Sequence, residues 1–178
     1  GAKAYISAQD GDRTTLTVGY SVPVASGVHG QVVSFCDGSD VTVSLFADGS
    51  AEPKYTVSVP GGTKDSSGQY TTTYDIPEVA PGTYTMQVSK KNHVTREYTV
   101  TVSGDVKTQD AKIHLMGDIN GDGRISIGDI NQANLHAKGK KILLGYELAC
   151  ADINGDGRVT TSDVNKMNLH NKGKSLLW

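Results

Sequence analysis

The chain has 178 residues, a formal net charge of −2 at pH 7 and two cysteines. So small a charge gives no electrostatic reason to expect nucleic acid or an anionic membrane as a partner, and two cysteines cannot form a disulfide framework. No apolar run is long enough to span a bilayer, and we expect no signal peptide within these residues.

The length suits one large domain or two small ones. Composition changes abruptly near Met116, from alternating apolar residues to a Gly- and Asp-rich repeat. We therefore expect two domains, at residues 1–115 and 116–178. Cys36 and Cys150 fall in different domains, so buried free thiols are favoured over a bridge.

The first domain is predicted to be β-structure almost throughout. Apolar residues alternate with polar residues or glycine, as in strands that bury one face. These runs are residues 16–22 (Leu16, Val18, Tyr20, Val22), 41–45, 55–59, 70–76, 84–88, 98–102 and 111–115. Turn signals such as Asp48-Gly49 and Pro81-Gly82 separate them. The pattern predicts a two-sheet antiparallel sandwich, with residues 1 to about 26 as an extra edge strand or an upstream tail.

The first domain shows no predicted active site. His29, His93 and His114 are scattered, without the spacing of a metal site. Cys36 has no evident His and Asn partners in the sequence. The tyrosines at strand period are expected to face the core, and a sugar-binding platform of exposed rings is the alternative.

Residues 118–129 have the pattern of a twelve-residue calcium loop, and residues 152–163 repeat it 34 positions later. Calcium takes six to eight oxygen ligands at about 2.3–2.6 Å, and such a loop supplies them only with a sharp turn at its sixth position. Gly123 and Gly157 occupy that position. The predicted ligands are Asp118, Asn120, Asp122, Arg124 (backbone carbonyl), Ser126 and Asp129, then Asp152, Asn154, Asp156, Arg158 (backbone carbonyl), Thr160 and Asp163. We expect two Ca²⁺ ions.

Each loop is predicted to run into one helix. These helices cover about residues 130–139 and 164–173, each with Lys near its last turn and Gly as its C-terminal signal. The segment 112–117 before the first loop instead indicates strand and turn. A calcium sensor of the EF-hand type changes the angle between two helices, so the first loop lacks half of that hinge.

Two loops with Asp rather than Glu at the twelfth position, each followed by a single helix, resemble a type I-like dockerin over about residues 117–178. The resemblance implies a small α-helical module with two EF-hand-like calcium loops that binds a cohesin domain of a scaffoldin or cell-surface anchoring protein. The spacer 145–152 is similar to spacers in dockerins of gut ruminococci.

The resemblance also implies a contact surface on the loop ends and helix faces. Between residues 118–144 and 152–178, 16 of 27 positions are identical, which implies two halves related by a pseudo-twofold axis. The implied partner-binding residues are Ile127, Gly128, Asn134, Leu135 and Lys138, then Thr161, Ser162, Asn168, Leu169 and Lys172. The loop ends differ between the copies, which argues against two equal binding modes. Leu135 and Leu169 could equally pack the two helices together.

Residues 76–90 resemble the hairpin of carboxypeptidase regulatory-like and collagen-adhesin B-type sandwiches, over about residues 27–115. This likeness implies an all-β Ig-like or prealbumin-like sandwich. A sandwich directly before a dockerin resembles the X-module and dockerin pairs of cellulosome-type systems.

The sequence thus predicts a non-catalytic, multi-domain adaptor, monomeric when alone. It would anchor a larger secreted protein, extracellular or at the cell surface, to a cohesin in a polysaccharide-degrading complex. Two alternatives remain open: a carbohydrate-binding sandwich attached through the dockerin, and a calcium-responsive EF-hand-like switch.

Overall fold

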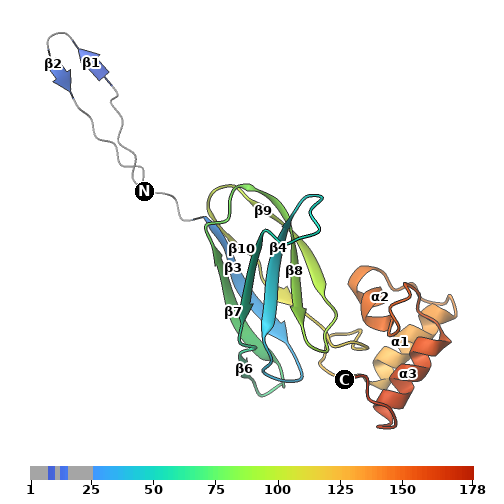
Figure 1. Ribbon diagram of the computed structural model, residues 1–178. Helices are drawn as coiled ribbons and strands as arrows, with labels where there is room; N and C mark the ends of the chain where they lie inside the picture. The colour runs from blue at the N-terminus through green and yellow to red at the C-terminus, as the bar shows by residue number, and fades with distance from the viewer. Residues whose placement is uncertain (1–7, 11–12, 16–25) are drawn as a thin grey trace.

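A computed structural model describes residues 8–10, 13–15 and 26–178. Strands β1 (Ala8–Asp10) and β2 (Arg13–Thr15) form an antiparallel pair that is a sheet of its own. These strands therefore do not extend the larger sheets as an edge strand (Figure 1). The strand predicted at residues 16–22 lies outside the described residues.

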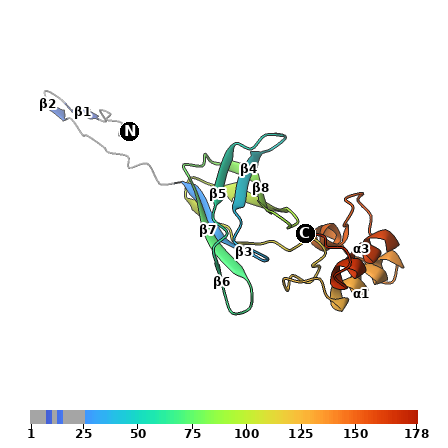
Figure 2. The ribbon, with the colours of Figure 1, turned by 60° about the horizontal axis from the view of Figure 1, so that its bottom comes forward.

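Residues 26–115, referred to below as part of the first domain, contain two further sheets (Figures 1 and 2). One has the order β10-β3-β7-β6, with β11 also paired to β3, and the other has the order β5-β4-β8-β9. The strands are β3 (Gly27–Ser34), β4 (Val41–Ala47), β5 (Tyr55–Val59), β6 (Thr63–Lys64), β7 (Tyr70–Pro77), β8 (Gly82–Lys90), β9 (Arg96–Val102), β10 (Val106–Thr108) and β11 (Ala111–Lys112). The predicted strands at 41–45, 55–59, 70–76, 84–88 and 98–102 are confirmed, and 111–115 is reduced to β11.

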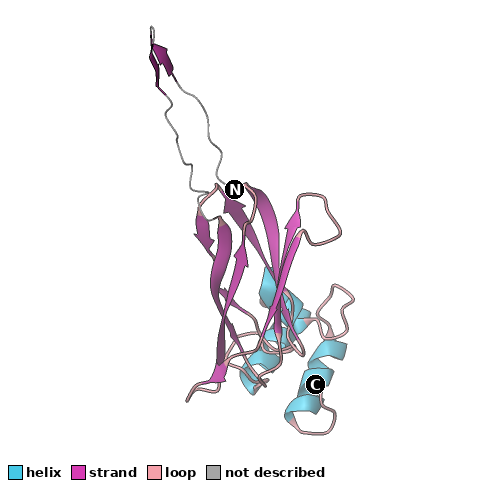
Figure 3. Ribbon diagram, turned by 60° about the vertical axis from the view of Figure 1, so that its left-hand side comes forward, coloured by secondary structure: helices cyan, strands magenta, loops and turns pink. Residues whose placement is uncertain are grey.

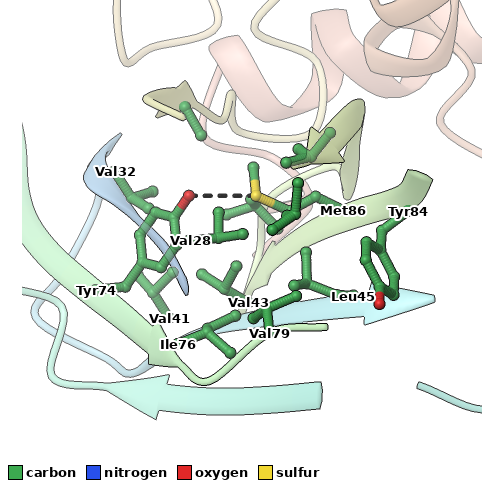
Figure 4. Close-up of a cluster of buried hydrophobic side chains, with 14 of the residues drawn as sticks. Val28, Val32, Val41, Val43, Leu45, Tyr74, Ile76, Val79, Tyr84 and Met86 are labelled. Carbon is green, nitrogen blue, oxygen red and sulfur yellow. Dashed lines mark hydrogen bonds between the residues drawn. The ribbon is translucent and has the colours of Figure 1, made fainter. Parts of the chain in front are cut away.

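The inward residues of both sheets meet in one core, which the alternating pattern predicts. Val41, Val43 and Leu45 of β4 are fully buried (Figure 4). The Tyr74 hydroxyl lies in the same core, donates to the Gln109 carbonyl at 2.6 Å and approaches the Met86 sulfur at 3.3 Å. The described tyrosines are buried or half-buried, so they do not make an exposed row of rings.

The antiparallel prediction is wrong for one edge, because β10 and β11 pair with β3 in parallel. The chain leaves the second sheet after β9 and crosses to the first, where it runs alongside β3. Between β10 and β11 the ladder is interrupted, and the Asp110 carboxylate accepts a hydrogen bond from the Gln31 N–H at 2.8 Å. A side chain at Gly30 would overlap the Gln109 carbonyl. Glycine at this position therefore allows the chain between β10 and β11 to pass close to β3.

Residues 116–178, referred to below as the second domain, contain α1 (Ile127–Ala137), α2 (Gly145–Ala151) and α3 (Thr161–Asn171), which gather near one end of the strands (Figure 3). Ser126 and Thr160 cap α1 and α3 in capping boxes with Asp129 and Asp163. Gly139 and Gly173 follow the helix ends with φ of +66° and +62°, as expected of C-terminal glycines. Within the described residues, no helix has the length and apolar character needed to cross a membrane.

One element was not predicted, and one sequence expectation needs correction. The spacer before the second loop is helix α2, so that loop has a short helix on its entering side as well. Cys150 is buried, but Cys36 is exposed, because it follows β3 in a turn with φ of +73°. Both cysteines are free.

Candidate metal centres and exposed helix faces

The first loop folds around the carboxylate of Asp118. Its two oxygens accept hydrogen bonds from the backbone N–H groups of Gly121 (2.8 Å), Asp122 (3.1 Å) and Gly123 (2.8 Å). Gly123 has a φ of +89°, a conformation that glycine adopts without steric cost. The aspartate at position 1 therefore fixes the turn at positions 4 to 6.

Asp129 closes the loop from its other end. One carboxylate oxygen accepts from the N–H groups of Ile119 (2.9 Å) and Asn120 (3.1 Å), and the other accepts from the Ser126 N–H (2.9 Å) and hydroxyl (2.8 Å). Asp129 thus joins the start of the loop to the first turn of α1. Its predicted place at position 12 gives it this reach, because position 12 is the third residue of the helix.

The second loop repeats these contacts. Asp152 accepts from Gly155 (2.9 Å), Asp156 (3.2 Å) and Gly157 (2.7 Å). Asp163 repeats the four bonds of Asp129, with Thr160 in place of Ser126. The two loops therefore share one backbone design, that is, the same pattern of hydrogen bonds from backbone N–H groups to the aspartates at positions 1 and 12.

Burial makes the negative charge of the first loop costly. Asp118 and Asp129 have no exposed surface, and burial, with a smaller contribution from the charge of Asp129, raises the pKa of Asp118 to about 6. As the side chains lie, residues 26–178 contain no group of three or more His, Cys, Asp or Glu positioned to hold a metal ion. The predicted ligand residues are therefore gathered in each loop, but their carboxylates are turned to backbone N–H groups.

The predicted contact residues line the outer faces of α1 and α3. Leu135 and Leu169 are 39% and 41% exposed, whereas Ala133 and Met167 are fully buried in the hydrophobic core of this region. Both leucines therefore keep part of their surface exposed, and their role in partner contact stays a prediction. Ile127, Gly128, Lys138, Thr161, Ser162 and Lys172 are exposed, and Asn134 and Asn168 are half-buried.

A junction between the two domains was not predicted. The Tyr146 hydroxyl of α2 donates to the Val94 carbonyl at 2.7 Å and accepts from the His114 N–H at 2.9 Å. The Arg96 guanidinium lies 4.6 Å from the centroid of the Tyr146 ring. The only sequence signal for this role was an aromatic residue within the short spacer.

Residues 116–170 match the family model of the dockerin type I domain. The match takes in both loops, α1 and α2, and nearly all of α3. The duplicated loop-and-helix segment is thus a dockerin domain. The search of curated proteins found no match.

Two solved structures resemble a larger part of the chain. Both are interface mutants of a type II cohesin–X-dockerin complex from Acetivibrio cellulolyticus. One is 22% identical with a TM-score of 0.37, covering 82% of this chain and 94% of that chain. The other is 20% identical with a TM-score of 0.33, covering 81% and 95%.

Proposed function

We propose that this chain is a non-catalytic adaptor whose dockerin domain binds a cohesin when calcium fills its two loops. The observation that carries the proposal is the dockerin match over residues 116–170, together with two loops of one backbone design. The adaptor would anchor a larger secreted protein in a cellulosome-type complex outside the cell.

The donor set of the loops fits calcium. Each loop offers carboxylate, amide, hydroxyl and backbone carbonyl oxygens, the hard ligands that this ion prefers. Asp118 is buried among backbone N–H groups, and the buried Asp129 lies close enough to raise its pKa, so a divalent cation would compensate an unbalanced charge. The twelve loop residues named from the sequence would hold the ions, which must draw the carboxylates of each loop together. The bound ions would hold each loop closed as structural elements.

The exposed faces of α1 and α3 are the proposed cohesin-binding surface. Their leucines are available to a partner because they are partly exposed, whereas Ala133 and Met167 are fully buried. An apolar side chain ringed by Asn and Lys suits the centre of an interface with a polar rim. Because the loop ends differ between the copies, we propose that one half contributes more than the other.

The first domain would act as a structural companion of the dockerin domain. Its two sheets support assignment as an Ig-like or prealbumin-like X-module, as in ruminococcal systems. The junction at Tyr146 supports this role, because it ties α2 to the strand region by two hydrogen bonds. The buried tyrosines disfavour a sugar-binding platform.

Leucine variants test the contact surface. We expect Leu135→Ala with Leu169→Ala to lose at least about a hundredfold in cohesin affinity, since buried anchors dominate interfaces, and the single variants to differ from each other. Ile142→Ala is the matched control, because Ile142 is an apolar residue 73% exposed outside the helix faces. Wild-type affinity in the double variant, measured on immobilised cohesin with calcium, would reject this surface.

A further inference from the structure

The first domain touches one calcium loop and leaves the other open. A side chain at Gly121 would overlap the His114 ring, and one at Gly123 would overlap the Phe35 ring. The equivalent positions of the second loop, Gly155 and Gly157, have nothing within 4 Å. Two loops with one backbone design thus lie in different surroundings.

Equivalent residues of the two loops also differ in burial. Gly121 is buried and Gly155 is exposed. Asp118 has no exposed surface, whereas its counterpart Asp152 is half-buried. The aspartate at position 1 is therefore fully shielded from water only in the first loop.

The side chain that covers the first loop is held firmly. Phe35 is 2% exposed, at the end of β3. Its N–H donates to the His93 ring nitrogen Nε2 at 3.0 Å, and its carbonyl accepts from the Lys90 ammonium at 3.3 Å. Because backbone bonds on both sides fix Phe35, the surface that it presents to Gly123 is preformed.

We propose that the first domain completes the first calcium site, so that calcium at this loop and docking of the two domains stabilise each other. The second loop binds calcium on its own. Contact with Phe35 and His114 orders the first loop in advance, which lowers the entropy cost of closing it on an ion, and exclusion of water strengthens the attraction of its carboxylates for the cation. Coupling of this kind is reciprocal. The inference rests on the calcium sites of the proposed function.

The test is a calcium titration of full-length variants by calorimetry. Asp152→Ala with Asp156→Ala leaves only the first loop competent, and Asp118→Ala with Asp122→Ala leaves only the second. We expect Phe35→Ala to weaken calcium binding about tenfold in the first protein and by less than about twofold in the second. Phe46→Ala is the matched control, because Phe46 is the other phenylalanine of the chain and lies in β4, one residue before that strand ends.

A pair of glycine variants keeps the test decisive if Phe35→Ala fails to fold. Gly121 and Gly155 have φ of +72° and +71°, so alanine strains both loops equally, and only Gly121→Ala meets His114. We expect Gly121→Ala to weaken calcium binding further than Gly155→Ala.

The outcomes separate the two proposals. Equal effects on both loops, in the Phe35 variants and in the glycine pair, would overturn the coupling while leaving the calcium sites in place. Absence of calcium uptake by the unsubstituted chain would instead overturn the proposed function and the coupling with it.

Discussion

The two cysteines show how local backbone decides the chemistry of single residues. Cys36 follows the buried Phe35 in a turn with φ of +73°, which leaves its side chain exposed. Cys150 is buried in α2, where burial raises the pKa of its thiol to about 12. The thiolate is the reactive form of cysteine. The two thiols should therefore react with thiol reagents at widely different rates.

A thiol-reactive reagent at pH 8 should therefore modify Cys36 rapidly and Cys150 only after unfolding. The Cys36→Ser variant should lose the fast phase and keep the slow one. Rapid modification of both thiols in the folded chain would contradict the burial of Cys150.

His93 links stability to pH. Burial lowers the pKa of His93 to about 4 in the folded protein, against 6.5 for an ordinary histidine. Above pH 6.5 the His93 side chain is neutral in both the folded and the unfolded state, and its contribution to stability is fully present. As pH falls from 6.5 toward 4, only the unfolded chain takes up the proton, so stability is lost, by about 3 kcal/mol at most.

The free energy of unfolding, measured in urea with chelator at pH 7 and pH 4.5, tests this linkage. His93→Gln cannot titrate, so it should lose about 2 kcal/mol less than the wild type between these pH values. Equal losses in the two proteins would show that His93 does not contribute.

At the scale of elements, α3 presents a buried and an exposed residue two positions apart. Met167 has no exposed surface and belongs to the hydrophobic core of the helical region, whereas Leu169 is 41% exposed. We expect Met167→Ala to destabilise the dockerin domain by about 2–5 kcal/mol and Leu169→Ala by less than about 1 kcal/mol. Urea unfolding checks this, and equal costs would place Leu169 in the core.

Elements with a regular period could be predicted, and those fixed by tertiary contacts could not. The alternation in β4, β7, β8 and β9 marks their buried faces directly. Strand β3 was missed because Gly30 and the adjacent Val32 and Val33 break its period of two. Helix α2 was missed because it has only seven residues and no side-chain cap.

At the scale of the whole molecule, the relation between the domains was beyond sequence reasoning. The two loops share the residues Asp-Ile-Asn-Gly-Asp-Gly-Arg, so no pattern within them tells which one is covered. The difference comes from Phe35, which is distant in the chain from the loop that it contacts, and from His114, which lies just before that loop. The positions of the loop residues were predictable because each role belongs to a fixed place in a local turn.

Removal of two carboxylates should affect one half of the dockerin domain. Asp118→Ala with Asp122→Ala leaves the N–H groups of the loop turn without acceptors and removes two proposed calcium ligands. We expect amide hydrogen exchange to rise over residues 118–137 while the strands β4 and β8 stay protected. The control, Asp152→Ala with Asp156→Ala, should shift the rise to residues 152–171, and unchanged exchange in both variants would contradict the role of these carboxylates.

The central claim, calcium-dependent cohesin binding, is tested most directly by calorimetric titration of the full chain against a panel of cohesins, first with calcium and then with excess chelator. We expect one-to-one binding to at least one cohesin in calcium, and loss of that binding in chelator. Absence of binding to every cohesin while calcium is still taken up, or binding that persists in chelator, would contradict it.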